Sequence, residues 1–305
     1  MARTPTVIAL RSVLVTVPVL APAVRFFSGT LGLQAGERPG PLPREWCAYW
    51  GLPTESRGQR LVGPETGRGG AVDLIAMREA ADPIRTPARP WANGIAALRL
   101  RTANIDTVAA ADALDALAGP ASYPVGPRTV LGARGYGPEN VACWFVQHDP
   151  PRDTHHLTDS GVQGIAFAVD HTDDVLPLFT DGFGGTVQAT QDPVPAAMRP
   201  VVGAAERITW IEWAGEEPFH VALVEHPTPL SERRDLSWRY NGRFTGVWGL
   251  SVTVDSVDAV VQMADRFRQP VRGRGRVTQP YSGRARTVAL RLPGGGWLEC
   301  VEASG

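Results

Sequence analysis

Four stretches of this chain share one pattern, in which an apolar, β-branched run leads through a polar break into an amphipathic segment that ends near glycine. The copies begin with SVLVTV at Ser12, ALRLRT at Ala97, GIAFAV at Gly164 and GLSVTV at Gly249. Apolar runs of this length predict buried strands, and the segments that follow have the spacing of short helices. The repetition predicts four copies of one structural unit.

The spacing of the copies supports the repeat. The first and third copies are separated by the same number of residues as the second and fourth. Each copy is followed by short strands and turns, and its last element is a closing strand. In most copies turn residues come directly before this closing strand. The four closing strands are predicted at 71–77, 142–147, 218–225 and 297–302. Too few helices remain to cover both faces of a parallel sheet, so the pattern predicts an α+β fold of four βαβββ modules.

The domain organisation follows from the polar segment at 148–160, which contains His155 and His156. We interpret this segment as a linker between two halves. The sequence then predicts two cup-shaped domains of two modules each, at 1–150 and 158–305, in which modules pair in sequence order.

Composition excludes several classes of protein. The 305 residues carry a formal net charge of −1, so no basic excess favours nucleic acid. Three cysteines without a CxxC spacing predict a reducing, cytoplasmic environment. The apolar run 13–20 imitates a secretory signal, but Thr16 and Pro18 interrupt it, and no apolar run is long enough for a membrane helix. We expect a protein without membrane or nucleic-acid partners, for which a homodimer is an open alternative.

Two motifs carry a resemblance to a known family. The first combines Val17, Leu20, Ala23, Phe26 and Phe27 with the sequence LGL at 31–33, and the second is LPGGGWLE at 292–299. Together with the βαβββ module, they resemble the vicinal oxygen chelate superfamily, which includes glyoxalase, bleomycin-resistance proteins and extradiol dioxygenases. The resemblance covers nearly the whole chain and is weakest in the second module. It implies the fold and leaves the reaction open, because one fold supports many functions.

The resemblance also implies where a metal would be bound, on the first and last strands of each module. The first-strand positions fall at Ser12, Ala97, Gly164 and Gly249, and the last-strand positions at Asp73, Trp144, His220 and Glu299. With modules paired in sequence, the N-terminal cup offers one ligand and the C-terminal cup two. A catalytic divalent ion needs about three protein ligands. We therefore predict no metal and no cofactor.

His220 and Glu299 are the predicted catalytic pair, because a histidine beside a carboxylate makes an oriented general base. The alternative is a buried polar contact. Glycines at 164 and 249 either widen the cavity or allow close backbone contact. Tryptophans beside these positions either bind a flat ligand or belong to the core. The predicted substrate-binding residues are Trp297, Trp248, Gly164, Gly249, Ser251, Trp144 and Asp73.

Two functions stay open on this evidence. The first is a metal-independent enzyme of bacterial secondary metabolism, an isomerase, cyclase or lyase acting on a bulky hydrophobic or aromatic small molecule. The second is a drug-binding protein that sequesters such a ligand without chemistry. A ring-cleaving, extradiol-type dioxygenase is third, because Gly164 and Gly249 stand where that chemistry needs histidine. The Arg- and Gly-rich segment 272–286 is either a lid for an anionic group or a solvated loop.

Overall fold

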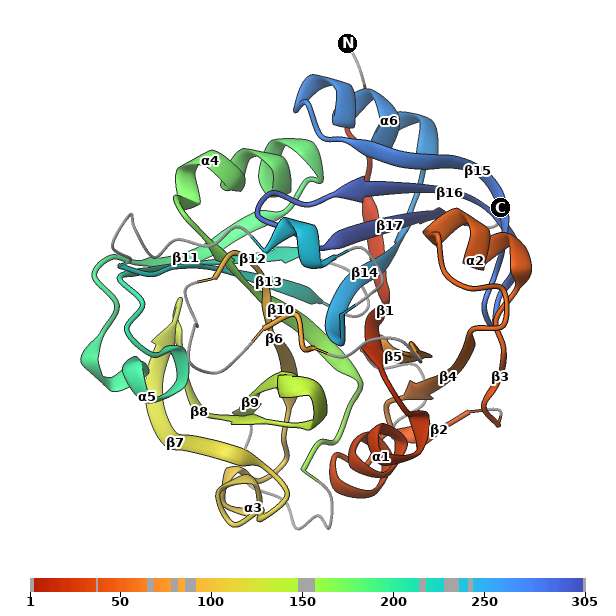
Figure 1. The fold of residues 1–305 in the computed structure, drawn as a ribbon. Helices are drawn as coiled ribbons and strands as arrows, with labels where there is room; N and C mark the ends of the chain where they lie inside the picture. The colour runs from red at the N-terminus through yellow and green to blue at the C-terminus, as the bar shows by residue number, and fades with distance from the viewer. Residues whose placement is uncertain are drawn as a thin grey trace.

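The computed structural model describes residues 3–36, 38–64, 69–77, 82–85, 92–147, 157–213, 218–227, 236–240 and 244–303. They form four modules, each with a first strand, a short helix and further strands, around two curved sheets (Figure 1). The predicted α+β class with four modules in two cups is confirmed. None of the helices in these ranges is long and apolar enough to cross a membrane.

The first two modules each begin with a long strand and a short helix. The elements of the first are β1 (Val7–Val17), α1 (Leu20–Val24) with a π-helical continuation (Arg25–Thr30), β2 (Gln34–Ala35), β3 (Gly40–Pro41), α2 (Arg44–Trp50), β4 (Arg57–Val62) and β5 (Ala71–Ala76). Those of the second are β6 (Gly94–Arg101), α3 (Ile105–Ala109), β7 (Asp115–Val125), β8 (Arg128–Tyr136), a 3-10 turn (Pro138–Asn140) and β9 (Ala142–Gln147).

The last two modules repeat this order. The elements of the third are β10 (Val162–Val169), α4 (Thr172–Pro177) with a π-helical continuation (Leu178–Gly182), β11 (Thr186–Gln191), a 3-10 turn (Ala196–Met198), α5 (Arg199–Val202), β12 (Arg207–Trp213) and β13 (Phe219–Glu225). A 3-10 turn (Ser237–Arg239) precedes the fourth, which contains β14 (Gly246–Val254), α6 (Val257–Arg266), β15 (Val271–Gln279), β16 (Gly283–Arg291) and β17 (Trp297–Glu302). The four closing strands lie where the sequence predicts them.

The two sheets combine modules that are not neighbours in sequence. The first sheet joins modules one and four through antiparallel β1 and β14, and the second joins modules two and three through antiparallel β6 and β10. We call their concave sides cup A and cup B. Sequential pairing is therefore a wrong prediction, and neither sheet corresponds to 1–150 or 158–305. All four modules expose the same edge of their first strand. The repeated pattern alone therefore does not determine which two modules pair in one sheet. Residues 148–156, with His155 and His156, lie outside the described residues.

A repeated contact ties three of the helices to their own modules. The side chain at the end of the last strand accepts a hydrogen bond from the first backbone N–H of the helix. The N-terminal N–H groups of a helix have no partner within the helix, so this bond satisfies one of them. The three pairs are Gln147 with the Ile105 amide (2.8 Å), Glu225 with the Thr172 amide (2.9 Å) and Glu302 with the Val257 amide (2.9 Å). The equivalent residue of the first module is Ala76, which cannot make this bond.

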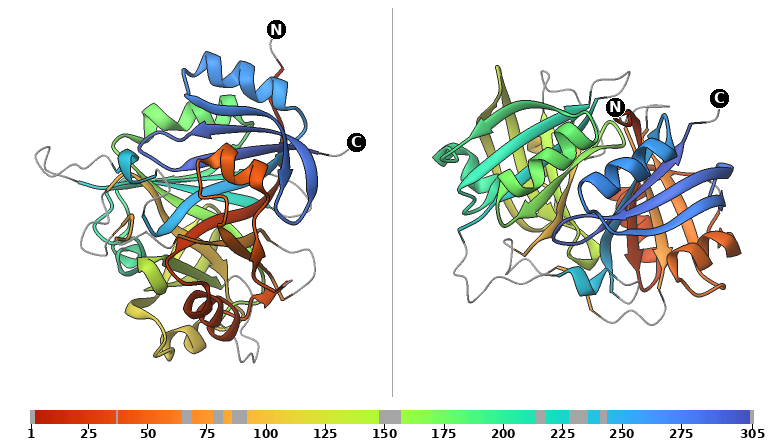
Figure 2. Two further views of the ribbon diagram at one scale, coloured as in Figure 1. Left: turned by 45° about the vertical axis from the view of Figure 1, so that its right-hand side comes forward. Right: turned by 90° about the horizontal axis from the view of Figure 1, so that it is seen from above.

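The hydrophobic residues form three clusters. One fills the space between the convex faces of the sheets and buries helix residues such as Phe27 and Val260. Helices α4 and α6 lie side by side there (Figure 2), and Gly182 packs against Met263. The other two clusters line cup A and cup B separately. Each cup is therefore a candidate site with its own lining.

Candidate functional site

Cup A is closed by tryptophan side chains. Helix α2, inserted between β3 and β4, brings Trp46 and Trp50 onto the concave face, where both are buried. The ring of Trp50 lies edge-on to Trp248, with centroids 4.8 Å apart, and to Trp297, with centroids 5.8 Å apart. Edge-to-face packing of large buried rings is a stabilising core arrangement. The predicted ligand-binding residues Trp248 and Trp297 therefore belong to a packed core.

Glu299 lies beneath these rings, with 2% of its surface exposed. Its Oε2 accepts a hydrogen bond from Ser251 Oγ at 2.8 Å, and its Oε1 accepts one from Trp46 Nε1 at 3.2 Å. Burial raises the pKa of the Glu299 carboxyl, and the hydrogen bond from Ser251 opposes this shift. Ser251, a predicted substrate contact, thus positions Glu299.

Asp73, the other carboxylate of cup A, forms a two-pronged ion pair. Arg60 donates from Nε and Nη2 to the two carboxylate oxygens, each at 2.7 Å. Burial lowers the pKa of Arg60, but the hydrogen bonds and charge of Asp73 more than offset this and raise it. Burial lowers the pKa of Arg11. The nearby charges of Glu299 and Asp73 oppose this shift without reversing it. The buried carboxylates of cup A therefore already face guanidinium groups.

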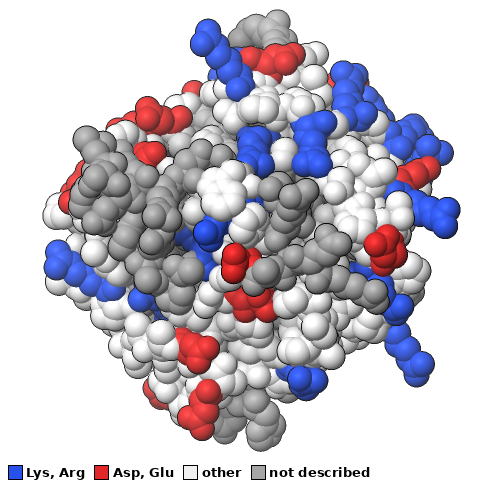
Figure 3. Space-filling view, viewed as in Figure 1, with Lys and Arg blue, Asp and Glu red and all other residues white. Residues whose placement is uncertain are grey.

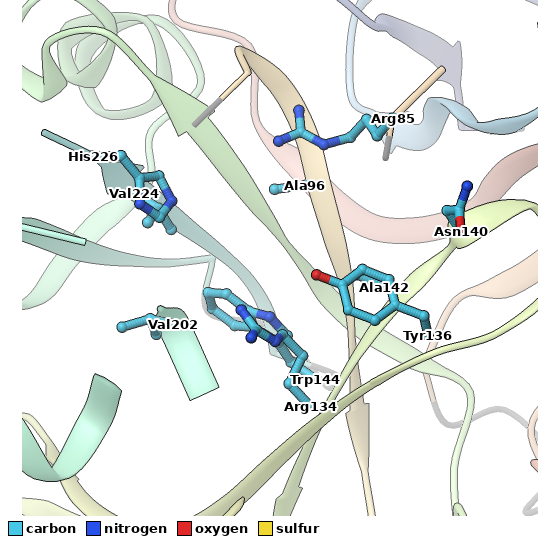
Figure 4. A pocket seen from close by; sticks show the side chains of 10 residues that line it. All are labelled: Arg85, Ala96, Arg134, Tyr136, Asn140, Ala142, Trp144, Val202, Val224 and His226. Carbon is cyan, nitrogen blue, oxygen red and sulfur yellow. The ribbon is translucent and has the colours of Figure 1, made fainter. Parts of the chain in front are cut away.

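Cup B contains a partly enclosed pocket (Figure 4). Strands β8, β9 and β13, helix α5 and the segment 82–85 contribute its lining. The tip of the Tyr136 side chain and the guanidinium of Arg85 extend into the space that Figure 4 shows between the labelled residues. The lining residues are Arg85, Ala96, Arg134, Tyr136, Asn140, Ala142, Trp144, Val202, Val224 and His226.

The shape of this pocket follows from small side chains at its edge. Helix α5 contributes Val202, where α2 in cup A contributes tryptophans. Trp144 forms a flat wall and lies beside Trp210, with centroids 6.5 Å apart. Asn140 reaches the rim through two successive left-handed residues, Glu139 (φ 58°) and Asn140 (φ 55°). Non-glycine residues in this conformation carry strain that is often found at binding sites.

The charged residues in the described lining of the cup B pocket are Arg85 and Arg134. Arg134 Nε is buried and has no hydrogen-bond partner. Burial lowers the pKa of Arg99, which is 2% exposed and lies over the Trp210 ring. Burial, followed by the charges of Arg85 and Arg134, lowers the pKa of His226 to about 4. His226 is therefore neutral at neutral pH.

Comparisons with known proteins agree with this architecture. Neither the scan against family models nor the search of curated proteins found a match. Among solved structures, glyoxalase I from Zea mays has a TM-score of 0.64 at 13% identity, with 96% of this chain and 92% of that chain covered. A candidate dioxygenase from Bacillus subtilis has a TM-score of 0.63 at 10% identity, with 98% of this chain and 86% of that one covered.

This chain has the vicinal oxygen chelate fold. In that fold the metal-ligand positions lie on the first and last strands that share a cup, so the observed module pairing regroups them. Cup A combines Ser12, Asp73, Gly249 and Glu299. Both oxygens of Asp73 bind Arg60, and Glu299 binds Ser251 and Trp46. Two carboxylates already engaged by donors do not fit a divalent ion, which needs about three available ligands.

Cup B offers still less to a metal ion. Strand pairing places Gly164 opposite His220 and Gly249 opposite Trp297, so His220 is equivalent to Trp297 rather than to Glu299. The true last-strand position of the third module is Ala222, and the cup combines Ala97, Trp144, Gly164 and Ala222. Within the described ranges no three His, Cys, Asp or Glu side chains form a group that could hold a metal. The vicinal oxygen chelate metal site therefore fits neither cup.

The predicted His220–Glu299 pair is not formed. His220 lies on β13 in cup B, and Glu299 lies on β17 in cup A. The prediction was wrong because it depended on sequential pairing, and because a shift of two residues on a strand keeps the same face. Proton transfer between these residues has no structural basis.

The two glycines serve close packing. A Cβ on Gly164 would overlap the carbonyl oxygen of His220, and one on Gly249 would lie 2.8 Å from the carbonyl oxygen of Trp297. Backbone atoms do not move aside as a flexible side chain can. Close approach of adjacent strands therefore accounts for both glycines, and the cavity-widening interpretation is not needed.

The Arg- and Gly-rich segment forms the β15–β16 hairpin at the edge of the first sheet. Figure 3 shows positive side chains over this region, at the upper right of the view. Arg274 and Arg286 both pair with Asp258 of α6, at 3.1 and 2.8 Å. The segment is a strand pair bonded to a helix, and it borders cup A, where Arg272 lies over the Trp50 and Trp297 rings.

Sequence reasoning found Trp144 in the pocket wall and missed most of its polar neighbours. On β8, Arg134 and Tyr136 lie on the cup side and alternate with residues on the opposite face of the sheet. This alternation is the sequence pattern that could have revealed them. His226 directly follows the closing strand β13. Arg85 comes from a connection between modules, and no sequence pattern indicates its place.

Proposed function

We propose that this protein binds a small hydrophobic or aromatic molecule in the pocket of cup B. The observation that carries the proposal is a partly enclosed pocket beside the Trp144 ring, whereas Trp46 and Trp50 fill cup A. Small-molecule sites are typically concave and mostly apolar, with a few polar groups that orient the ligand. Val202, Val224 and the alanines of the lining supply apolar surface of this kind.

Sequestration of the ligand is the function that this site supports best. An acid–base enzyme was the leading interpretation of the sequence only while His220 and Glu299 could act together. Those residues lie in different cups, whereas a binding protein needs no more than the pocket. The third interpretation, an extradiol dioxygenase, finds no suitable ligand set in either cup among the residues that the structure describes.

A metal-independent isomerase or lyase of bacterial secondary metabolism remains the second candidate, because the pocket contains the imidazole of His226 and the phenol of Tyr136. A neutral imidazole can accept a proton from a ligand. Its pKa of about 4 makes it a weak base at neutral pH, since proton transfer is most efficient when the pKa lies near the working pH. Catalysis therefore ranks below binding.

Saturation-transfer NMR with 2-naphthamide, a neutral planar aromatic, tests the binding proposal. The wild type should show transfer to the ring protons, and Val202→Trp should abolish it by filling the pocket. Val187→Trp, on exposed β11, is the matched control and should leave binding unchanged. Equal transfer in the wild type and Val202→Trp, with unchanged melting temperatures, would show that the probe binds elsewhere and refute the proposal.

Turnover separates sequestration from catalysis. Small molecules released by denaturing the purified protein are added to fresh wild type and to His226→Asn, and followed by chromatography and mass spectrometry. A sequestering protein returns them unchanged in both samples. Conversion by the wild type alone, with binding retained in His226→Asn, would make the enzyme the correct function.

A further inference from the structure

We propose that the ligand of cup B carries an anionic group of carboxylate geometry, bound by Arg134 beside the Trp144 ring. This inference rests on the proposed binding function and adds the chemical class of the ligand. An aromatic carboxylate would place its ring against Trp144 and its charge on the guanidinium. The planar fork of arginine matches a carboxylate with two parallel hydrogen bonds.

Strand register within this one chain supplies the main argument. Arg60 on β4 pairs with Asp73 on β5, and Arg134 on β8 pairs with Trp144 on β9. Asp73 and Trp144 occupy equivalent positions of their modules, so the two arginines are equivalent as well. In cup A the carboxylate that binds the arginine is built into the protein. In cup B a tryptophan replaces it, and a ligand can supply the missing carboxylate.

The surroundings of Arg134 agree with a missing partner. Its Nε is buried without a hydrogen-bond partner, although a buried donor left unsatisfied lowers stability. The described lining of the pocket contains no Asp or Glu. Arg85 lies in the same lining, where its Nη1 donates a hydrogen bond to the Asn93 carbonyl oxygen at 3.2 Å. A bound anion would offset the cost of burying the Arg134 guanidinium.

His226 reports the same positive potential. After burial, the charges of Arg85 and Arg134 are the causes that lower its pKa to about 4. A neutral imidazole can donate one N–H to an anion without adding charge. The pocket thus combines guanidinium, imidazole, phenol and amide groups around one apolar wall.

Matched pairs of ligands test the inference by isothermal titration calorimetry. The probes are benzoate and 2-naphthoate, each compared with its primary amide, which has nearly the same shape but no charge. The carboxylates should bind at least about tenfold more tightly to the wild type. Arg134→Met should weaken carboxylate binding by about tenfold or more and amide binding by much less, because only the carboxylate loses a charge-assisted pair. Arg274→Met, an exposed arginine of the β15–β16 hairpin, should change neither.

The outcomes separate the two levels of the proposal. Equal affinity for amides and carboxylates, or an equal loss of both in Arg134→Met, would refute the anionic ligand while leaving the pocket as a binding site. Binding of no probe by the wild type would refute both proposals. Trp144→Asp gives an independent check, because an internal carboxylate facing Arg134 should abolish the preference for carboxylates, and a preference that persists would contradict the inference.

Discussion

The two cups are built from the same kind of module, but differ in what lies across their concave faces. In cup A, helix α2 inserts Trp46 and Trp50 against Trp248, and the buried carboxylates already have donors. In cup B, the corresponding insertion contributes Val202 and leaves a pocket with an arginine whose Nε is unpaired. A single scaffold can therefore hold a structural core or a ligand site, depending on the side chains of one short insertion and one strand position.

Replacing Trp50 by alanine should give the largest effect. Its ring is fully buried and contacts Trp46, Trp248 and Trp297, so the cavity should cost about 3–5 kcal/mol of unfolding free energy. Trp144→Ala should cost roughly half as much, because one side of that ring borders the pocket. Chemical denaturation measures both. Equal losses would show that Trp144 is core and that the cups do not differ in this respect.

Replacing the two equivalent arginines should separate the cups next. Arg60→Met leaves the carboxylate of Asp73 buried without its partner and should cost about 3 kcal/mol. Asp73→Asn in the same protein should restore part of this loss. Arg134→Met exposes no uncompensated carboxylate and should cost under about 1 kcal/mol. An Arg134→Met protein as unstable as Arg60→Met would mean that cup B contains a hidden partner for Arg134.

Acid should weaken the protein through His226. Its pKa of about 4 in the folded state lies below the unfolded value, so between about pH 6.5 and 4 the unfolded state binds more protons. Stability should therefore fall as pH falls through this window, by about 2 kcal/mol between pH 7.5 and 4.5 from this residue. In His226→Asn the unfolding free energy should fall by about 2 kcal/mol less over this pH range than in the wild type. Chemical denaturation at both pH values measures the difference. An unchanged slope would place the neutral imidazole outside the buried pocket.

Chelation should have the smallest effect. Among the residues that the structure describes, neither cup has three available ligands, so dialysis against EDTA should leave the melting temperature unchanged within about 1 °C. Elemental analysis should find far less than one equivalent of iron, manganese, nickel or zinc. Stoichiometric metal, lost together with stability in Glu299→Ala, would contradict the ligand assignment in cup A.

Local pattern was enough to predict the modules, because strand alternation, turn residues and the short helices repeat along the chain. The closing strands were located to within a residue or two, and Trp144 was recognised as a candidate from its position. The pairing of modules could not be predicted from local pattern, because the paired strands β1 and β14 are far apart in the sequence. The predicted site was wrong as a result, because the observed pairing places its residues in different cups. The polar groups Arg85 and His226 of the observed pocket come from connections whose positions depend on that tertiary arrangement.

The pairing of the first and last modules also sets an order for folding during synthesis. Cup B can close once β13 has left the ribosome, because modules two and three are contiguous in the chain. Strand β1 must wait for β14, so that Ser12 meets Ser251 only after the fourth module has been synthesised. Until then the first module has an exposed strand edge, and long-range pairing of this kind is slow and prone to aggregation. The first module therefore completes its sheet only when the fourth module is available to pair with it.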